Sequence, residues 1–199
     1  PLVSLLAKEN DPKTKAEGAG ALLALCTGQP ETQKLVADAG AIKPLVVLLS
    51  EEDDNARKKA AGAIGALCNG STENQDAVEK NKGLGKLVGL LGSSSDGTAF
   101  DDQGRAEAAS ALATLAQGHS KNQDRIAASG GIEPLVGLLQ GETDEHAKEE
   151  AAAALWSLSA KHYQNQVSIA DAGGIAPVVA VLGLGSVRAQ EQAAGALAS

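Results

Sequence analysis

Apolar residues return along this chain in a long repeating pattern. Residues 130–159 show it most clearly, with Gly-Gly-Ile-Glu-Pro-Leu-Val-Gly-Leu-Leu, an acidic stretch and an Ala-rich run that ends in Leu-Trp-Ser-Leu-Ser. The first apolar core recurs at Pro1-Leu2-Val3, Pro44-Leu45-Val46, Lys86-Leu87-Val88, Pro134-Leu135-Val136 and Pro177-Val178-Val179. The Ala-rich part keeps step through Leu22, Ile64, Leu112, Leu155 and Leu197. Both sets recur every 42 to 48 residues, a period that predicts a solenoid of stacked units.

Each unit is predicted to contain three helices, and residues 40–82 serve as the model. Gly40 ends the preceding helix in a left-handed conformation, and Pro44 suits the first position of a short helix. The polar run 50–55 forms a turn. A long helix over residues 57–68 then buries small and aliphatic side chains at helical spacing. The third helix begins near Asn74, and we expect this Asn to cap it. The matching capping residues are Thr32, Asn122 and Asn165.

The repeat pattern divides the chain into one continuous solenoid of five units. These are a partial repeat at 1–39, repeats at 40–82, 83–129 and 130–172, and a partial repeat at 173–199. Since the chain opens and closes inside the pattern, we expect it to be a fragment of a longer protein. The repeat at 83–129 carries an insertion at 92–104, which is polar and Gly-rich and contains the only Phe, Phe100. The insertion is interpreted either as a tolerated surface loop or as a loop that offers Phe100 to a partner.

Composition and charge exclude several classes of function. Hydrophobic residues make up 43% of the chain and aromatic residues 2%, so the core is built of Ala, Leu, Val and Ile. A formal net charge of -8 argues against a nucleic-acid partner, because such affinity comes from Lys and Arg neutralising phosphates. No apolar run approaches the roughly 18 residues of a membrane span, and no basic start followed by an apolar core indicates a secretory signal. We therefore expect a soluble chain without direct membrane insertion.

The reactive side chains do not gather into a catalytic or metal-binding pattern. Cys26 and Cys68 occupy equivalent places in successive units, too far apart for a disulfide, and are interpreted as small reduced core residues. This interpretation favours an intracellular and cytoplasmic protein, with nucleus and organelle left open. The histidines are scattered, so no metal site, cofactor or enzyme activity is predicted. Asn69-Gly70-Ser71 matches a glycosylation acceptor but is interpreted as an ordinary turn after a helix.

The motif resembles the armadillo repeat. The residues that carry the resemblance are Gly-Gly-Ile-x-Pro-Leu-Val-x-Leu-Leu, an acidic turn, Ala-Ala-x-Ala-Leu-x-x-Leu and Asn-Gln-x-x-Ile followed by Ala-Gly, and they span the whole chain. The resemblance implies an all-α fold, a right-handed superhelix of three-helix repeats. The long third helices of the family's repeat line a concave groove that binds other proteins. The fold does not supply a particular partner.

Two family members that share this scaffold, importin-alpha and beta-catenin, depend on residues that this chain replaces. Their groove uses an Asn that holds an extended peptide, at positions that here are Ala24, Ala66, Thr114 and Ser157. Importin-alpha also has Trp four residues earlier, where this chain has Gly20, Gly62, Ser110 and Ala153. The stretch Leu-Trp-Ser-Leu-Ser at 155–159 is more similar to the armadillo tails of plant ubiquitin ligases and to vacuolar armadillo scaffolds.

Helical spacing from these replaced positions predicts the groove lining. The candidate partner-binding residues are Glu17, Gly20, Ala24, Lys58, Lys59, Gly62, Ala66, Phe100, Glu107, Ser110, Thr114, Glu149, Glu150, Ala153, Trp156 and Ser157. A floor of small residues favours a helix or a folded surface over an extended peptide. Trp156 is either an interface residue or a space-filling contact with the Gly-rich run 193–196. The basic run 57–59 and the acid pair 149–150 either orient a partner or are solvated helix starts.

These features favour a non-catalytic scaffold that binds protein partners. The alternative is the recognition arm of a ubiquitin ligase, although no U-box lies in the chain. A third hypothesis is a cargo adaptor for nuclear transport. The absence of the groove Asn residues that hold an extended peptide in importin-alpha disfavours it.

Overall fold

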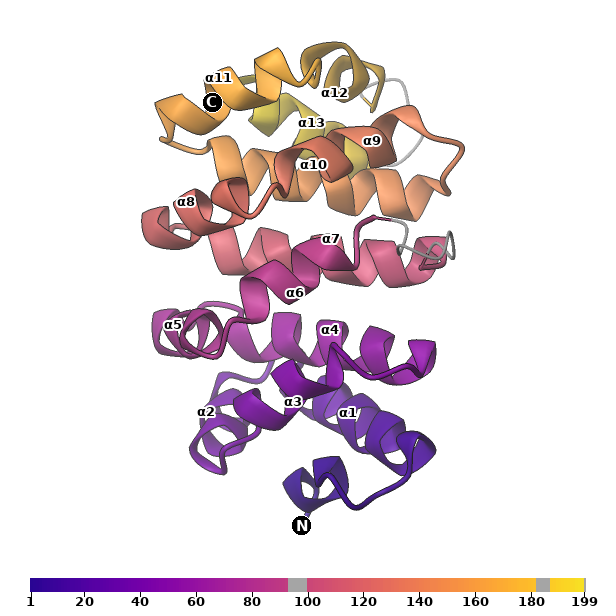
Figure 1. The fold of residues 1–199 in the computed structure, drawn as a ribbon. Coiled ribbons are helices and arrows are strands. Elements are labelled where there is room, and N and C mark those ends of the chain that lie inside the picture. The colour runs from indigo at the N-terminus through magenta and orange to yellow at the C-terminus, as the bar shows by residue number, and fades with distance from the viewer. Residues whose placement is uncertain (93–99, 182–186, 199) are drawn as a thin grey trace.

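The helices of this chain stack into one elongated array (Figure 1). The computed structural model describes residues 1–92, 100–181 and 187–198, and every regular element within these ranges is a helix. The elements are η1 (Val3–Leu6), α1 (Pro12–Cys26), α2 (Pro30–Asp38), α3 (Ile42–Leu48), α4 (Asp54–Cys68), α5 (Thr72–Lys80), α6 (Gly83–Gly89), α7 (Asp102–Ala116), α8 (Ser120–Ala128), α9 (Ile132–Gln140), α10 (Glu145–Ser159), α11 (Tyr163–Asp171), α12 (Ile175–Val181) and α13 (Val187–Ala198). The predicted all-helical solenoid is confirmed.

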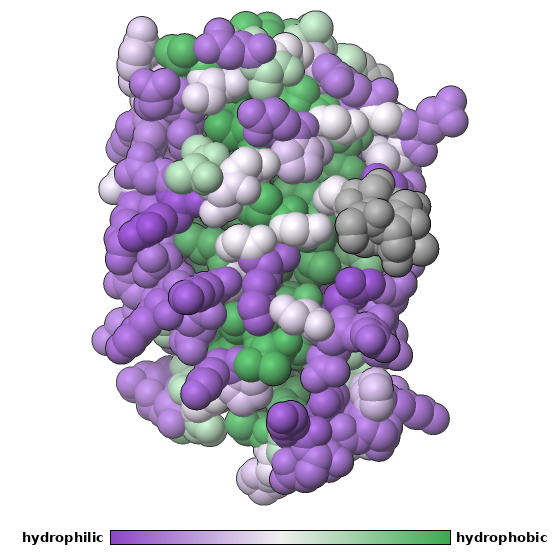
Figure 2. Space-filling model, in the orientation of Figure 1, coloured by the Kyte–Doolittle hydropathy of each residue, from purple (hydrophilic) through white to green (hydrophobic). Residues whose placement is uncertain are grey.

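Three kinds of helix alternate along the array. The helices α1, α4, α7 and α10 each have 15 residues and pack against one another in order, with α13 continuing the row. The helices α2, α5, α8 and α11 have nine residues and lie along one side. The helices α3, α6 and α9, of seven, seven and nine residues, cross in front of the long helices in Figure 1. Figure 2 shows mostly polar side chains over α2, α5, α8 and α11 and apolar ones over α3, α6 and α9. In the described ranges no helix is long and apolar enough to cross a membrane.

The acidic turns place an aspartate at the start of each 15-residue helix. Each side chain accepts a hydrogen bond from the backbone N–H three residues later. The pairs are Asp11 with Thr14 at 3.0 Å, Asp53 with Ala56 at 2.7 Å, Asp101 with Gly104 at 2.8 Å and Asp144 with Ala147 at 2.7 Å. A carboxylate there satisfies an unpaired helical amide and faces the positive end of the helix dipole. The acidic residues before the long helices therefore fix where these helices begin.

The predicted Asn caps are wrong, because these side chains lie inside the nine-residue helices and point into the core. The helices α5, α8 and α11 are capped by Ser71, His119 and His162 instead. The Asn side chains donate from Nδ2 to a carbonyl near the end of the preceding long helix. These bonds join Asn74 to Leu67 at 2.6 Å, Asn122 to Leu115 at 2.9 Å and Asn165 to Leu158 at 3.0 Å. The Asn residues therefore satisfy carbonyls that the helix end leaves unpaired.

In three units a buried Gln, directly after Thr32, Asn74 or Asn122, ties its unit to the next one. Its side-chain amide donates to a backbone carbonyl near the end of the next long helix. The bonds run from Gln33 to Ala66 at 2.9 Å, from Gln75 to Thr114 at 2.9 Å and from Gln123 to Ser157 at 2.7 Å. The three Gln side chains are at most 4% exposed. Because the accepting residues belong to the predicted groove lining, this ladder fixes the spacing of the long helices there.

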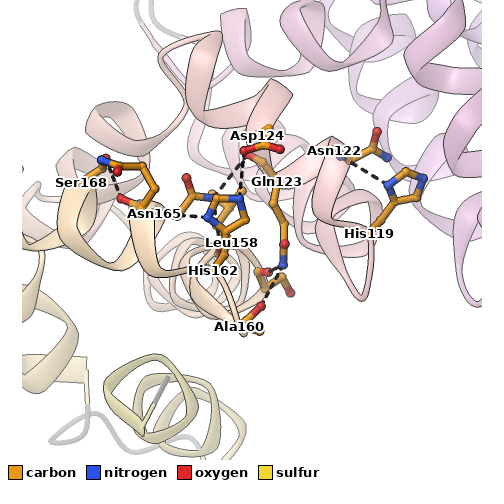
Figure 3. A network of polar contacts seen from close by, with 11 residues as sticks. His119, Asn122, Gln123, Asp124, Leu158, Ala160, His162, Asn165 and Ser168 are labelled. Carbon is orange, nitrogen blue, oxygen red and sulfur yellow. Dashed lines mark hydrogen bonds and ion pairs between the residues drawn. The ribbon is translucent and has the colours of Figure 1, made fainter.

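The two capping histidines also contact the nine-residue helix before their own, and Figure 3 shows this contact for His162 and Asp124. His162 accepts the backbone N–H of Asn165 at Nδ1, 3.3 Å away, and its Nε2 lies 2.9 Å from Asp124 Oδ1 of α8. His119 accepts the N–H of Asn122 at 3.3 Å, and its Nε2 lies 3.3 Å from Asp76 Oδ1 of α5. Each imidazole therefore caps its own helix and contacts the helix before it.

The core follows the apolar repeat found in the sequence. Leu22, Ile64, Leu112 and Leu155 are at most 1% exposed and sit on consecutive long helices. Cys26 and Cys68 are buried free thiols, as predicted. Burial raises the pKa of the Cys68 thiol to about 12.

Phe100 belongs to this core, which corrects its assignment as a partner anchor. The side chain is 5% exposed, and the Arg57 guanidinium lies 5.0 Å from the centroid of its ring. The ring covers Gly104 in the first turn of α7, so it fills space where that helix has no side chain. Residues 93–99 of the insertion lie outside the described ranges. Phe100 is thus a packing residue that anchors the start of α7.

Two glycines inside long helices predict opposite effects of substitution by Ala. At Gly104 an added Cβ would lie 2.6 Å from Phe100 Cδ1, so overpacking costs about 1–3 kcal/mol. At Gly20 the nearest atom would be Lys59 Cδ at 3.6 Å, an ordinary contact, and Ala gains about 0.5–1 kcal/mol of helix propensity. We expect urea unfolding to show Gly104→Ala less stable than the parent and Gly20→Ala more stable. If both variants gained stability, the packing described for Phe100 would be wrong.

Candidate functional site: a groove along the long helices

Two adjoining cavities lie along the row of long helices. The first, of about 440 Å³, lies among α1, α4 and α7, and its lining includes Gly62, Ala66 and Glu107. The second, of about 350 Å³, lies between α7 and α10, and its lining includes Glu150 and Trp156. Ser110 and Thr114 line both. The two cavities together are called the groove below.

The structure brings many of the candidate residues together in this groove. Those that line one or both cavities are Gly62, Ala66, Glu107, Ser110, Thr114, Glu150, Ala153, Trp156 and Ser157. Glu17, Gly20, Ala24, Lys58, Lys59 and Glu149 lie on the same long helices outside the two linings. Lys58 Nζ instead lies 2.6 Å from Asp101 Oδ2, where it lowers the pKa of that carboxyl. Sequence reasoning missed Thr27, Asn69 and Gln117, which follow the ends of long helices and also line the groove.

The groove holds two carboxylates on neighbouring long helices. Glu150 is 3% exposed, and Glu107 lies over Gly62, where an added Cβ would come within 2.8 Å of Glu107 Oε2. Burial raises the pKa of Glu107, and the negative charge of Glu150 acts in the same direction. His146, Lys59 and Lys58 act in the opposite direction. The absence of a side chain at Gly62 is therefore what makes room for the Glu107 carboxylate.

Trp156 packs against α13 and also lines the groove. Its side chain lines the second cavity and the residue is 38% exposed. The same ring covers Gly195 of α13, where an added Cβ would lie 2.6 Å from Trp156 Cδ2. The contact with α13 holds the indole in place, and the exposed part of the residue remains available at the groove margin.

The raised pKa of Glu107 predicts a pH-dependent effect of Glu107→Gln. A group whose pKa is raised by folding contributes stability below its unfolded pKa, and this contribution is lost as pH rises through the folded pKa. At neutral pH the ionised Glu107 therefore disfavours the fold. We expect Glu107→Gln to raise the melting temperature at neutral pH, with the difference shrinking on acidification through the range where Glu takes up a proton.

A matched control for this substitution is Glu17→Gln, since Glu17 occupies the equivalent place on α1 and is exposed. We expect little change in its melting temperature at either pH. An equal gain in both variants would show that the effect comes from net charge and not from burial of Glu107.

The described residues contain no group of three or more His, Cys, Asp or Glu side chains placed to hold a metal ion. The groove is polar and its floor is made of small residues. It holds two carboxylates, and one indole lies at its margin.

Comparison with known proteins identifies the class to which this groove belongs. Residues 29–69 and 119–160 match the model of the armadillo/beta-catenin-like repeat. No curated protein matches the chain. An engineered protein of known structure is similar over 99% of this chain and 76% of its own, with a TM-score of 0.88 and 35% identity. A designed armadillo repeat protein in complex with the peptide (KR)4 has a TM-score of 0.82 and 26% identity, over 99% of this chain and 79% of its own.

The fold and the groove define an armadillo solenoid. This chain belongs to the armadillo repeat family.

Proposed function

We propose that this chain is a non-catalytic scaffold that binds partner proteins in the groove along α1, α4, α7 and α10. The observation that carries the proposal is the pair of cavities that share Ser110 and Thr114 of α7. Together their linings extend over the consecutive long helices α1, α4, α7 and α10. A designed relative with the same repeat carries a peptide in its structure, which supports binding of a polypeptide by this class of solenoid.

The partner is proposed to present a helix or a folded surface. The groove floor is built of small residues such as Gly62, Ala66 and Ala153, so a broad surface approaches closely. The positions at which family members clamp an extended peptide with Asn carry Ala24, Ala66, Thr114 and Ser157. The carbonyls of the last three already accept the Gln ladder.

The chemistry of the second cavity favours a cationic partner residue. Glu150 of α10 and the indole of Trp156 line this cavity, and Glu107 of α7 lines the adjoining first cavity. A Lys or Arg side chain is attracted both by carboxylates and by the face of an indole. The formal net charge of -8 also favours a basic partner, because opposite charges attract over long range.

Purification of partners from cell extract with the chain as bait tests the proposal. The affinity of each recovered partner is then compared with the affinities of overlapping short peptides that cover its sequence. The proposal expects the folded partner to bind at least about tenfold more tightly, or 1.4 kcal/mol, than any single peptide. If one linear peptide carried the full affinity, the extended-peptide mode would replace the folded-surface mode.

The identities of the recovered proteins separate the proposed scaffold role from its alternatives. A stable set of non-catalytic subunits supports the scaffold. Recovery of ubiquitin-conjugating enzymes would favour the recognition arm of a ubiquitin ligase, of the kind found in plants. Recovery of nuclear carriers would favour a transport adaptor.

A further inference from the structure

Four turns in this solenoid share one backbone conformation and differ in side-chain chemistry. Each follows a 15-residue helix. The first turn residues have nearly identical φ and ψ angles, which are -63° and 113° at Thr27, -65° and 112° at Asn69, -62° and 111° at Gln117, and -58° and 109° at Ala160. The next residue is left-handed in each case, with φ of 68° at Gly28, 73° at Gly70, 66° at Gly118 and 57° at Lys161. The chain thus presents a natural series in which the side chain is the main variable.

We propose that the Asn69–Gly70 turn is a site of spontaneous deamidation, which converts Asn69 into aspartyl and isoaspartyl forms. The backbone nitrogen of Gly70 attacks Cγ of Asn69 and loses its proton, the side-chain nitrogen leaves as ammonia, and a five-membered succinimide forms. Water then opens the ring at either carbonyl carbon and gives aspartate or isoaspartate. No oxidant or reductant is required. This inference is independent of the proposed partner binding.

The other three turns lack one requirement for this reaction. Thr27 and Ala160 carry no side-chain amide. Gln117 has an amide and is followed by Gly118 in the same conformation, but its additional methylene would require a six-membered ring. Asn69 alone combines a five-membered ring closure with a Gly on its carboxyl side, where no side chain hinders the attacking nitrogen.

The surroundings of Asn69 leave it freer to react than its counterparts. The backbone N–H groups of Thr27, Gln117 and Ala160 donate to the carbonyl four residues earlier, at 3.1, 3.1 and 3.0 Å. In the described part of the chain no such bond forms at Asn69, its exposed side chain has no hydrogen-bond partner, and the Gly70 N–H donates to no acceptor. A Cβ added at Gly70 would meet nothing within 4 Å. The rotation about the Cα–C bond of Asn69 that ring closure requires is therefore weakly opposed.

The other asparagines, by contrast, are protected from this deamidation. Asn10, Asn74, Asn81, Asn122 and Asn165 use their side-chain amides to donate hydrogen bonds to backbone carbonyls. Asn55 lies in the first turn of α4, where the helical backbone holds its neighbour. The structure therefore assigns the reaction to a single asparagine.

The products change the turn in two ways. A new carboxylate stands at the carbonyl end of α4, where the helix dipole disfavours negative charge. The isoaspartyl form also adds a methylene to the main chain two residues before Ser71, whose Oγ accepts the Asn74 N–H and caps α5. Because Asn69 lines the first cavity, the charge also enters the groove wall. Conversion therefore lowers the stability of the α4–α5 connection.

The test is incubation of the intact folded protein at mildly alkaline pH, followed by peptide mapping and by labelling with an isoaspartyl methyltransferase. Parent protein is compared with Asn69→Thr and Asn69→Gln, which place the residues of two sibling turns in the same backbone. We expect the parent alone to accumulate the label, at residue 69, with no conversion at Gln117. Its melting temperature falls as the label accumulates, whereas both variants keep theirs.

A synthetic peptide spanning residues 66–74 is incubated in parallel. If the peptide becomes labelled and the folded parent does not, the fold protects the turn and the proposal is overturned. Labelling of the parent at another asparagine first, or undiminished labelling of Asn69→Thr, would overturn it equally.

Discussion

Leu112→Ala is expected to lower the free energy of unfolding by about 2–5 kcal/mol, the range for removing a buried Leu side chain. Leu112 is fully buried in α7, and α7 packs against both α4 and α10. Removing its side chain leaves a cavity at the centre of the array, where the surrounding helices are held on both sides. Urea unfolding followed by circular dichroism measures the change.

Leu25→Ala is the matched control for this loss. Leu25 lies on α1 and is 45% exposed, so the same chemical change should cost less than about 0.5–1 kcal/mol. A loss at Leu112 as small as the loss at Leu25 would contradict a continuous core. Because units of a solenoid are stabilised by their neighbours, we also expect Leu112→Ala to broaden the unfolding transition.

Trp156→Ala is expected to weaken partner binding by about 2 kcal/mol or more, which is about 30-fold in affinity. Trp156 is the aromatic side chain in the groove lining, and the contact with Gly195 holds it in place before a partner arrives. An anchor that is already ordered loses little conformational entropy on binding. Isothermal titration with a purified partner measures the change in affinity.

The packing of Trp156 on α13 requires a second variant, because Trp156→Ala also opens space over Gly195. Trp156→Leu retains apolar packing there and loses the indole. If the groove margin binds the partner, both variants lose affinity for it. The melting temperature of Trp156→Leu should fall less than that of Trp156→Ala. A fall in melting temperature with unchanged affinity in both variants would assign Trp156 to packing alone.

The repeat and its helices were predictable because they depend on the periodicity of apolar residues, which can be read directly from the sequence. Leu22, Ile64, Leu112 and Leu155 had to lie on one buried row once the period was known, and they do. The same spacing placed Ser110, Glu150 and Trp156 on one face of the long helices, and all three line the second cavity. That these residues bind a partner remains a proposal.

The errors concerned polar and single residues whose partners lie elsewhere in the fold. Asn74 has the right residue type for a cap, but the structure uses Ser71 for that role and turns Asn74 toward the end of α4. Phe100 follows a polar stretch, and only the close approach to Gly104 and Arg57 shows that it is buried. Neither contact could be derived from spacing along a helix, because each joins a side chain to a helix end or to a glycine.

The most direct test of the central claim is to block the groove and to compare this change with an equal change outside it. Ser110 lines both cavities, so Ser110→Arg places a long side chain at their junction. Gly137→Arg is the control, because Gly137 is exposed on α9, outside the two linings, and a Cβ there meets nothing within 4 Å. Recovery of partner proteins by each variant, with matched circular dichroism spectra, is the measurement. The account predicts that Ser110→Arg loses the partner and Gly137→Arg keeps it, whereas retention of the partner by both variants would contradict binding in the groove.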